Sequence, residues 1–207
     1  MERNTNTETP VSSPTDTPTP CVIHFLDVLP TDYFYEPVRY LYCHGVISGY
    51  GDGTFRPYNL TTRGQLAKII VLAEGWPIYT PPTPTFRDVP TTHTFYAVIE
   101  TAYNHGIISG YECGPNCLEY LPGNNVTRAQ LCKIIVLAEN WEITPPTVPT
   151  FRDVPPEDPF YGFVETAYAH GIISGYDCGT GCREFRPGNN ATRGQISKIV
   201  YLAVTGP

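Results

Sequence analysis

The chain has 207 residues and a formal net charge of −7, from 13 basic and 20 acidic side chains. A protein this acidic is not expected to bind nucleic acid, because phosphate groups need a basic surface. Its apolar runs all fall short of the roughly 18 residues of a membrane-spanning helix, so we expect no membrane insertion.

The first stretch of the chain, residues 1–21, is predicted to be a linker. It is rich in Thr and Pro and has almost no apolar side chains, so it should be extended or disordered. Met1 is followed by polar and charged residues rather than by a basic and then an apolar segment, which excludes a recognisable signal peptide here. If the protein is exported, we expect its signal peptide to lie outside this chain.

Beyond the linker, one pattern occurs three times. The motifs Phe-x-Asp-Val, His-Gly-x-Ile-Ser-Gly-Tyr and Thr-Arg-x-Gln recur in the same order. The first motif begins at Phe25, Phe86 and Phe151, which are 61 and then 65 residues apart. This self-similarity predicts one supersecondary unit used three times, with repeats at 22–80, 81–145 and 146–207. Since units of about 60 residues bury little apolar surface alone, the three should share a core.

The first helix of each repeat is predicted from apolar residues at helical spacing, which begin at Phe34, Phe95 and Phe160. A His-Gly pair follows each of these stretches. The glycine suits the left-handed conformation that closes a helix, and the histidine would lie at the negative end of the helix dipole. We therefore interpret the histidines as helix ends rather than as metal ligands.

The second helix of each repeat has a capping-box signature, in which a threonine and the glutamine three residues later bond to each other's backbone amide. These boxes begin at Thr62, Thr127 and Thr192, and an apolar stripe follows each one. Packing the three stripes against each other about a pseudo-threefold axis would bury all of them. We expect an all-α fold with these helices as a central bundle.

An arginine follows the capping threonine in every repeat, as Arg63, Arg128 and Arg193. The positive end of a helix dipole disfavours a cation, so the recurrence of arginine there indicates function. A guanidinium beside the unpaired amides of a helix start would form an anion-binding corner. The alternative is that each arginine pairs with the aspartate of a Phe-x-Asp-Val motif and ties one repeat to the next. The sequence leaves both open.

No catalytic motif accompanies these features. The chain contains no G-x-S-x-G, no H-E-x-x-H, no Walker loop and no glycine-rich nucleotide fingerprint. We therefore expect a binding module that is not an enzyme and that uses no cofactor or metal.

The order of the motifs resembles that of the S-layer homology (SLH) domain over residues 25–205, with three copies as is usual for that module. The resemblance implies a three-pronged, pseudo-threefold α-helical domain with grooves between the prongs. It also implies an extracellular module that holds an exported protein on the bacterial cell surface. Its ligand would be an anionic, often pyruvylated, secondary cell-wall polysaccharide.

The resemblance also implies which residues bind the ligand. The Thr-Arg-Ala-Glu motif of the family, its early aspartate and its Ser-Gly segment each match all three repeats. The implied ligand-binding residues are Arg63, Arg128, Arg193, Asp27, Asp88, Asp153, Phe34, Phe95, Phe160, Ser48, Gly49, Ser109, Gly110, Ser174 and Gly175. Two departures stand out. Gln replaces the usual Glu in every copy, and Phe replaces the expected Trp, which leaves a smaller surface for stacking on sugar.

Four cysteines lie in four-residue insertions of the second and third repeats. We interpret Cys113–Cys117 and Cys178–Cys182 as local disulfides, which indicates an oxidising, extracytoplasmic location. The alternative is a zinc site that uses all four thiolates, but it would require loops on different prongs to meet.

The remaining three cysteines have no such pattern. Cys21 and Cys43 could form a disulfide between linker and helix or stay unpaired. Cys132 fills a position that Ala67 and Ser197 occupy in the other repeats, so we expect a small buried thiol.

Together these features predict a cell-surface anchoring module whose partner is an acidic cell-envelope polysaccharide. One alternative is a self-assembling subunit, a homo-oligomer in an S-layer, sheath or filament. Another is the C-terminal anchor of a larger exported hydrolase.

Overall fold

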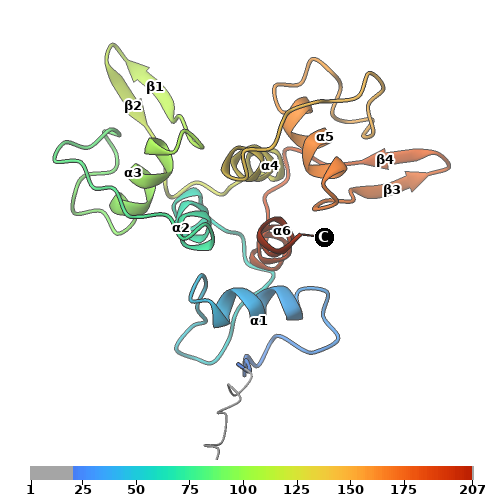
Figure 1. The fold of residues 1–207 in the computed structure, drawn as a ribbon, viewed down its shortest axis with the longest axis horizontal. Helices are drawn as coiled ribbons and strands as arrows, with labels where there is room; N and C mark the ends of the chain where they lie inside the picture. Colours follow the sequence, from blue (N-terminus) through green and yellow to red (C-terminus); the bar gives the residue numbers. More distant parts are fainter. Residues whose placement is uncertain (1–20, 207) are drawn as a thin grey trace, which may run out of the picture.

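The computed structural model describes residues 21–206, so the predicted linker lies outside the described residues except for Cys21. Within this range the chain forms six helices and two short hairpins (Figure 1). The helices are α1 Tyr35–Cys43, α2 Arg63–Ala73, α3 Tyr96–Asn104, α4 Arg128–Ala138, α5 Tyr161–Ala169 and α6 Arg193–Thr205. Each repeat contributes two of them, which confirms the predicted helices. None of the helices in this range is long and apolar enough to cross a membrane.

The two hairpins are the part of the fold that was not expected. Strands β1 Tyr111–Gly114 and β2 Cys117–Glu119 pair antiparallel, as do β3 Tyr176–Gly179 and β4 Cys182–Glu184. They form the loops that carry the four-residue insertions, and in Figure 1 they project outward from their lobes. The first repeat lacks the insertion and closes the same connection with a tight turn, in which Tyr50 N–H donates to the Thr54 carbonyl at 2.8 Å. The fold is therefore helix-rich but not all-α.

The predicted helix boundaries are confirmed by the bonds that cap them. In each second helix the Gln side chain accepts the N–H of the capping threonine, at 2.9 Å for Thr62 and 3.1 Å for Thr127 and Thr192. The first helices end at a histidine followed by a glycine with φ near +72°. Two of these histidines, His105 and His170, stack on tryptophans that follow α2 and α4.

The packing of the helices links each repeat to the next. The second helices α2, α4 and α6 lie at the centre of the molecule, and the first helices lie outside them (Figure 1). Helix α2 packs against α3, α4 against α5, and α6 against α1. The last pair joins the end of the chain to its beginning. Because each helix pair spans two repeats, the principal core draws on all three.

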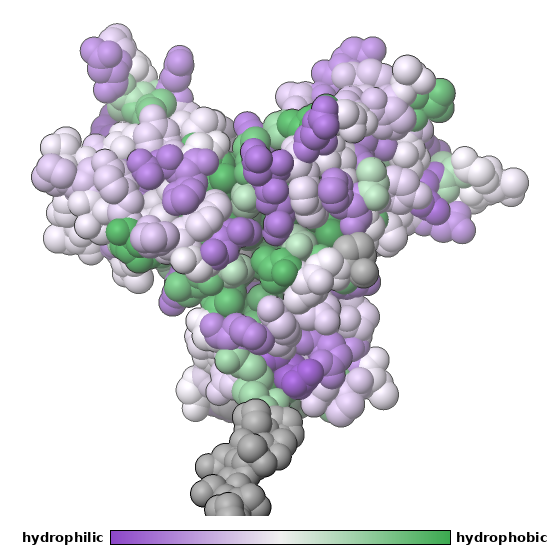
Figure 2. Space-filling model, viewed as in Figure 1, coloured by the Kyte–Doolittle hydropathy of each residue, from purple (hydrophilic) through white to green (hydrophobic). Residues whose placement is uncertain are grey.

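A ring of backbone hydrogen bonds closes the centre just before the second helices. Val126 N–H donates to the Thr61 carbonyl at 3.0 Å, Ala191 to Val126 at 2.9 Å, and Thr61 to Ala191 at 3.2 Å. On the face shown in Figure 2, hydrophobic surface gathers where the lobes meet, above the central helices. The repeats therefore meet through main-chain bonds as well as through the core.

Three disulfides brace the outer parts of the fold. The local bonds Cys113–Cys117 and Cys178–Cys182 are present as predicted, so their thiolates are not free to bind zinc. Cys21 and Cys43, which the sequence left open, are also bonded to each other. Cys132 is a free thiol buried in α4, as expected, and burial raises its pKa to about 12.

Candidate functional site

Three clefts lie between the repeats, and each is lined by side chains from all three repeats. We number each cleft by the repeat that supplies its Ser-Gly-Tyr segment. The cleft volumes are about 210 Å³ for cleft 1, 130 Å³ for cleft 2 and 340 Å³ for cleft 3. Cleft 1 includes Arg193, Ser48, Tyr50, Lys68 and Phe95; cleft 2 includes Arg63, Ser109, Tyr111, Lys133 and Phe160; cleft 3 includes Arg128, Ser174, Tyr176, Lys198 and Tyr33.

The predicted arginines are held in place by the backbone of the following repeat. Arg63 Nε donates to the Tyr120 carbonyl at 2.8 Å, and the guanidinium lies 4.5 Å from that ring and 5.0 Å from the Tyr111 ring. Arg128 is placed in the same way by the third repeat, through a 2.9 Å bond to the Phe185 carbonyl and contacts with the Tyr176 and Phe185 rings. Cation–π contact on two sides and one backbone bond fix the orientation of the planar group.

The third arginine, Arg193, follows the same pattern. Its Nε donates to the Phe55 carbonyl at 3.0 Å, and an Nη donates to the Ser48 carbonyl at 3.1 Å. Burial lowers its pKa from the usual arginine value, but a guanidinium remains charged at neutral pH.

The arginines are largely enclosed but keep free donors. Arg63 and Arg128 are each 7% exposed. Arg128 makes one side-chain hydrogen bond among the described residues, and its guanidinium has five N–H donors. Within this range, the hydroxyls of Thr61 and Thr166 are the only fully buried side-chain polar atoms without a partner. The unpaired nitrogens of Arg128 therefore reach solvent, and Arg128 lines cleft 3.

The expectation of unpaired amides beside these arginines is wrong. Arg63 N–H donates to the Asn124 carbonyl at 2.8 Å, and Gly64 N–H donates to the Pro122 carbonyl at 3.0 Å. The next amide, of Gln65, donates to the capping threonine. The same bonds recur at α4 and α6. These helix starts join repeat to repeat, so any affinity for an anion must come from side chains.

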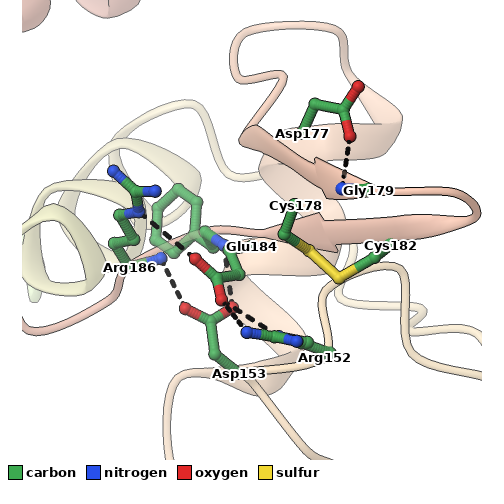
Figure 3. A network of polar contacts seen from close by, with 9 residues as sticks. Arg152, Asp153, Asp177, Cys178, Gly179, Cys182, Glu184 and Arg186 are labelled. Carbon is green, nitrogen blue, oxygen red and sulfur yellow. Dashed lines mark hydrogen bonds and ion pairs between the residues drawn. A yellow bond between two sulfur atoms is a disulfide. The ribbon is translucent and has the colours of Figure 1, made fainter.

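The alternative in which each arginine pairs with an aspartate is also wrong. Asp153 instead accepts the backbone N–H groups of Phe185 at 2.8 Å and Arg186 at 2.7 Å (Figure 3). The equivalent carboxylates make the same two bonds in the other repeats. The aspartates Asp27, Asp88 and Asp153 do not line clefts 1 to 3. They hold the segment whose carbonyl bonds the arginine.

The Ser-Gly segments line the three clefts. Ser48, Ser109 and Ser174 are exposed and line them. Packing also explains the glycine that follows each serine, because a Cβ at Gly49 would overlap the ring of Phe25. Gly110 and Gly175 meet the equivalent phenylalanines in the same way.

The three phenylalanines cap the first helices at equivalent positions but differ in exposure. Phe95 and Phe160 are half-buried and line clefts 1 and 2. Phe34 is 1% exposed and lies in the core against Gly194, so it cannot present a face to a sugar. Its neighbour Tyr33 lines cleft 3.

Sequence reasoning missed the lysines. The chain has only three, Lys68, Lys133 and Lys198, and each lies in one cleft. They follow the arginines by five residues in every repeat, and this spacing could have identified them. The tyrosines that end the Ser-Gly-Tyr segments also line the clefts, although sequence reasoning did not predict them as site residues.

The electrostatic character of the clefts differs from that of the whole chain. Each of the three holds an arginine and a lysine, and no Asp or Glu of residues 21–206 lines them. The chain as a whole has a net charge of −7. Positive charge in concave surfaces of an acidic protein attracts anions there. The same range contains no group of three or more His, Cys, Asp or Glu that could hold a metal.

Comparison with known proteins connects these clefts to a family. The sequence pattern that defines the S-layer homology domain matches residues 24–67, 85–132 and 150–196. The chain belongs to the S-layer homology family. Each of the three matched segments falls within one of the three predicted repeats, and every cleft is built from all three.

Three relatives of this chain are an enzyme and two proteins named for the cell surface. The chain is 29% identical over 181 residues to an endoglucanase of Bacillus sp. (strain KSM-635), covering 85% of the chain and 18% of the enzyme. It is 28% identical to the surface-layer 125 kDa protein of Lysinibacillus sphaericus, covering 81% and 14%. It is also 28% identical to cell surface glycoprotein 1 of Acetivibrio thermocellus, covering 76% and 7%. The chain thus spans less than a fifth of each relative.

Proposed function

We propose that this SLH chain is a non-catalytic cell-surface anchoring module that binds an acidic cell-envelope polysaccharide in clefts 1 to 3. The observation that carries the proposal is the pairing of one arginine with one lysine in every cleft, without a lining carboxylate. A guanidinium binds a carboxylate through paired, geometrically fixed hydrogen bonds. A lysine adds a mobile charge that can follow an adjacent group.

Each type of lining residue has a role in this proposal. Arg63, Arg128 and Arg193 bind the anionic group, and the lysine of the same cleft assists them. The exposed serines donate hydrogen bonds to sugar hydroxyls, and Phe95 and Phe160 contact the apolar face of a sugar ring. Asp27, Asp88 and Asp153 are positioning residues that act through the backbone.

The same proposal covers the arrangement of the repeats. We propose that repeats 22–80, 81–145 and 146–207 are related by a pseudo-threefold axis along the central helices. The cyclic bonds among Thr61, Val126 and Ala191 support it, as does the recurrence of each cleft. Three similar sites on one module would favour a polymer that repeats its acidic unit, because linked sites raise the effective concentration.

An extracellular location belongs to this proposal. Three disulfides in one domain persist in oxidising compartments and are rare in the cytosol. The relatives named as surface-layer and cell surface proteins agree with this location. The endoglucanase relative contains a stretch that matches this chain. An enzymatic cargo for this chain is therefore a further proposal, and sequence outside these 207 residues would test it.

The first test removes charge from the clefts by changing the lysines, and it keeps the arginines and their bonds to backbone carbonyls. Changing Lys68, Lys133 and Lys198 to Gln should weaken binding to a purified acidic wall polysaccharide by about tenfold or more in isothermal titration, because three charge-assisted contacts are lost. Changing the three cleft arginines to Gln should abolish binding.

The matched control changes Arg87, Arg152 and Arg183 to Gln. It removes the same net charge from exposed positions outside clefts 1 to 3. If control and cleft variants bind equally, the clefts are not the site. Concentration-dependent assembly without polysaccharide in sedimentation velocity would favour the self-assembling subunit instead.

A further inference from the structure

The three clefts are not chemically equal, and the first repeat supplies the difference. Tyr33 and Tyr58 are exposed to 53% and 72%. The residues at the same places in the later repeats are Thr94 and Pro159 for Tyr33, and Gly123 and Gly188 for Tyr58. Two large aromatic side chains on the surface are thus confined to one repeat. Core packing does not explain their exposure.

The two tyrosines lie on either side of a buried ring. Phe34 contacts both edge-to-face, with ring centroids 4.9 Å from Tyr33 and 5.8 Å from Tyr58. Burial raises the pKa of the Tyr33 hydroxyl, and the nearby hydroxyls of Tyr58 and Tyr176 act in the same direction. Tyr33 lines cleft 3 together with the Ser-Gly-Tyr segment of the third repeat. The buried Phe34 contacts both tyrosine rings and fixes their positions.

Tyr33 connects the tyrosine pair to the charged part of cleft 3. Tyr33 and Arg128 line this cleft together, and Lys198 Nζ lies 5.5 Å from the Tyr33 ring centroid. Cleft 3 is also the largest of the three, at about 340 Å³ against 210 and 130 Å³. An anion at Arg128 would thus have an aromatic surface beside it. Clefts 1 and 2 have a half-buried phenylalanine there, Phe95 or Phe160, and a glycine at the place of Tyr58.

We propose that cleft 3 is a longer carbohydrate site than clefts 1 and 2, in which Tyr33 and Tyr58 bind a second, neutral sugar residue next to the acidic one. This proposal rests on the proposed function, since it assigns a further part of the same ligand. One face of a pyranose ring carries only C–H groups and packs on an aromatic face, while its hydroxyls bond at the edge. The two cations of the cleft are committed to the acidic residue.

The experiment isolates one cleft at a time. Changing Arg63 and Arg193 to Gln leaves cleft 3 active, and changing Arg128 and Arg193 to Gln leaves cleft 2 active. The substitutions Tyr33→Thr and Tyr58→Gly, which introduce the residues of the second repeat, are then added to each protein. The probe is acidic wall polysaccharide, partly hydrolysed and separated into single acidic sugars and longer oligosaccharides. Affinity is measured by isothermal titration.

The expected result depends on ligand length. In the cleft 3 protein, the two tyrosine substitutions should weaken oligosaccharide binding by about tenfold and leave binding of the single acidic sugar within about twofold. In the cleft 2 protein, they should change neither affinity. Tyr33→Phe should retain most of the affinity, because it keeps the ring. Equal losses for both ligands, or no loss, would overturn the inference.

A second measurement needs no substitution in the tyrosines. In the cleft 3 protein, ring currents should shift the C–H protons of the second sugar upfield in NMR spectra of the bound oligosaccharide. The cleft 2 protein should show no such shift for that sugar, and a shift in neither protein would contradict the tyrosine site. Failure of the proposed function looks different, because then no single-cleft protein binds any acidic fragment.

Discussion

The aspartates of the Phe-x-Asp-Val motif explain how a residue outside the clefts can control them. Each accepts two consecutive backbone N–H groups, and the second belongs to a non-glycine residue with positive φ: Arg56, Leu121 or Arg186. A left-handed conformation costs such a residue about 1 kcal/mol. Two successive amides in this arrangement form a concave anion site, which the carboxylate fills. The aspartate thus fixes the carbonyl that orients the arginine.

Asp88→Ala should therefore lower both stability and the affinity of one cleft. Losing two charge-assisted bonds should reduce the free energy of unfolding by about 2 kcal/mol in urea titration. Leu121→Gly in the same background should restore about 1 kcal/mol, because glycine tolerates the left-handed conformation. The control Asp177→Ala removes one exposed bond in a hairpin. A loss no larger than that of the control would contradict the role of Asp88.

Each central helix serves two clefts at once. Helix α2 places Arg63 in cleft 2 and, one and a half turns later, Lys68 in cleft 1. Its glutamine caps the helix, and in α4 the equivalent Gln130 also donates to the Tyr111 hydroxyl at 3.0 Å. A neutral amide can make both contacts without adding negative charge between two cations. A rotation of one helix would alter two clefts together.

The C-terminal ends of two central helices carry a pair of glutamates in an unfavourable arrangement. Glu74 and Glu139 follow α2 and α4, where the helix dipole disfavours negative charge. Burial and the charge of Glu74 raise the pKa of Glu139 from about 4.5 to about 7. The pKa of Glu74 is also raised, chiefly by burial. The folded protein therefore holds a proton that the unfolded chain releases.

The melting temperature should for this reason depend on pH. The contribution of Glu139 to stability is fully present below about pH 4.5 and is lost as the pH rises through about 7, because ionisation is harder in the folded state. Glu139→Gln should remove this decline in thermal unfolding measured from pH 4 to 8. The exposed Glu142→Gln is the matched control. An unchanged slope in the Glu139 variant would contradict the assignment.

The features that the sequence could predict are those that depend on residues close together along the chain. Capping boxes join residues three positions apart, and local disulfides join residues four apart, so both were predictable. The bond from Arg63 to the Tyr120 carbonyl spans 57 residues, and only the fold brings the two together. The arginines and serines were assigned to the clefts through repetition and resemblance. The prediction of free amides at the helix starts was wrong because bonds between repeats use these amides. The sequence of a single repeat does not reveal such bonds.

The molecule as a whole should unfold in one step, because its core and its ring of backbone bonds include all three repeats. Trp76 and Trp141 stack on histidines across different repeat boundaries. In Trp76→Phe and Trp141→Phe, the remaining tryptophan reports on one boundary by fluorescence. We expect its urea midpoint to match that of far-ultraviolet circular dichroism in each variant. Separate midpoints would show that the repeats unfold independently.

The bond between Cys21 and Cys43 has a mechanical consequence. A pulling force that arrives at Cys21 crosses the sulfur atoms to the end of α1, so the chain between these two residues carries no load. Helix α1 lies within this bypassed segment, so the contact between α1 and α6, where the last repeat meets the first, is outside the direct path of the tension. A load attached before Cys21 would therefore pass to the chain after Cys43 and leave the contact that closes the circle of repeats unstrained.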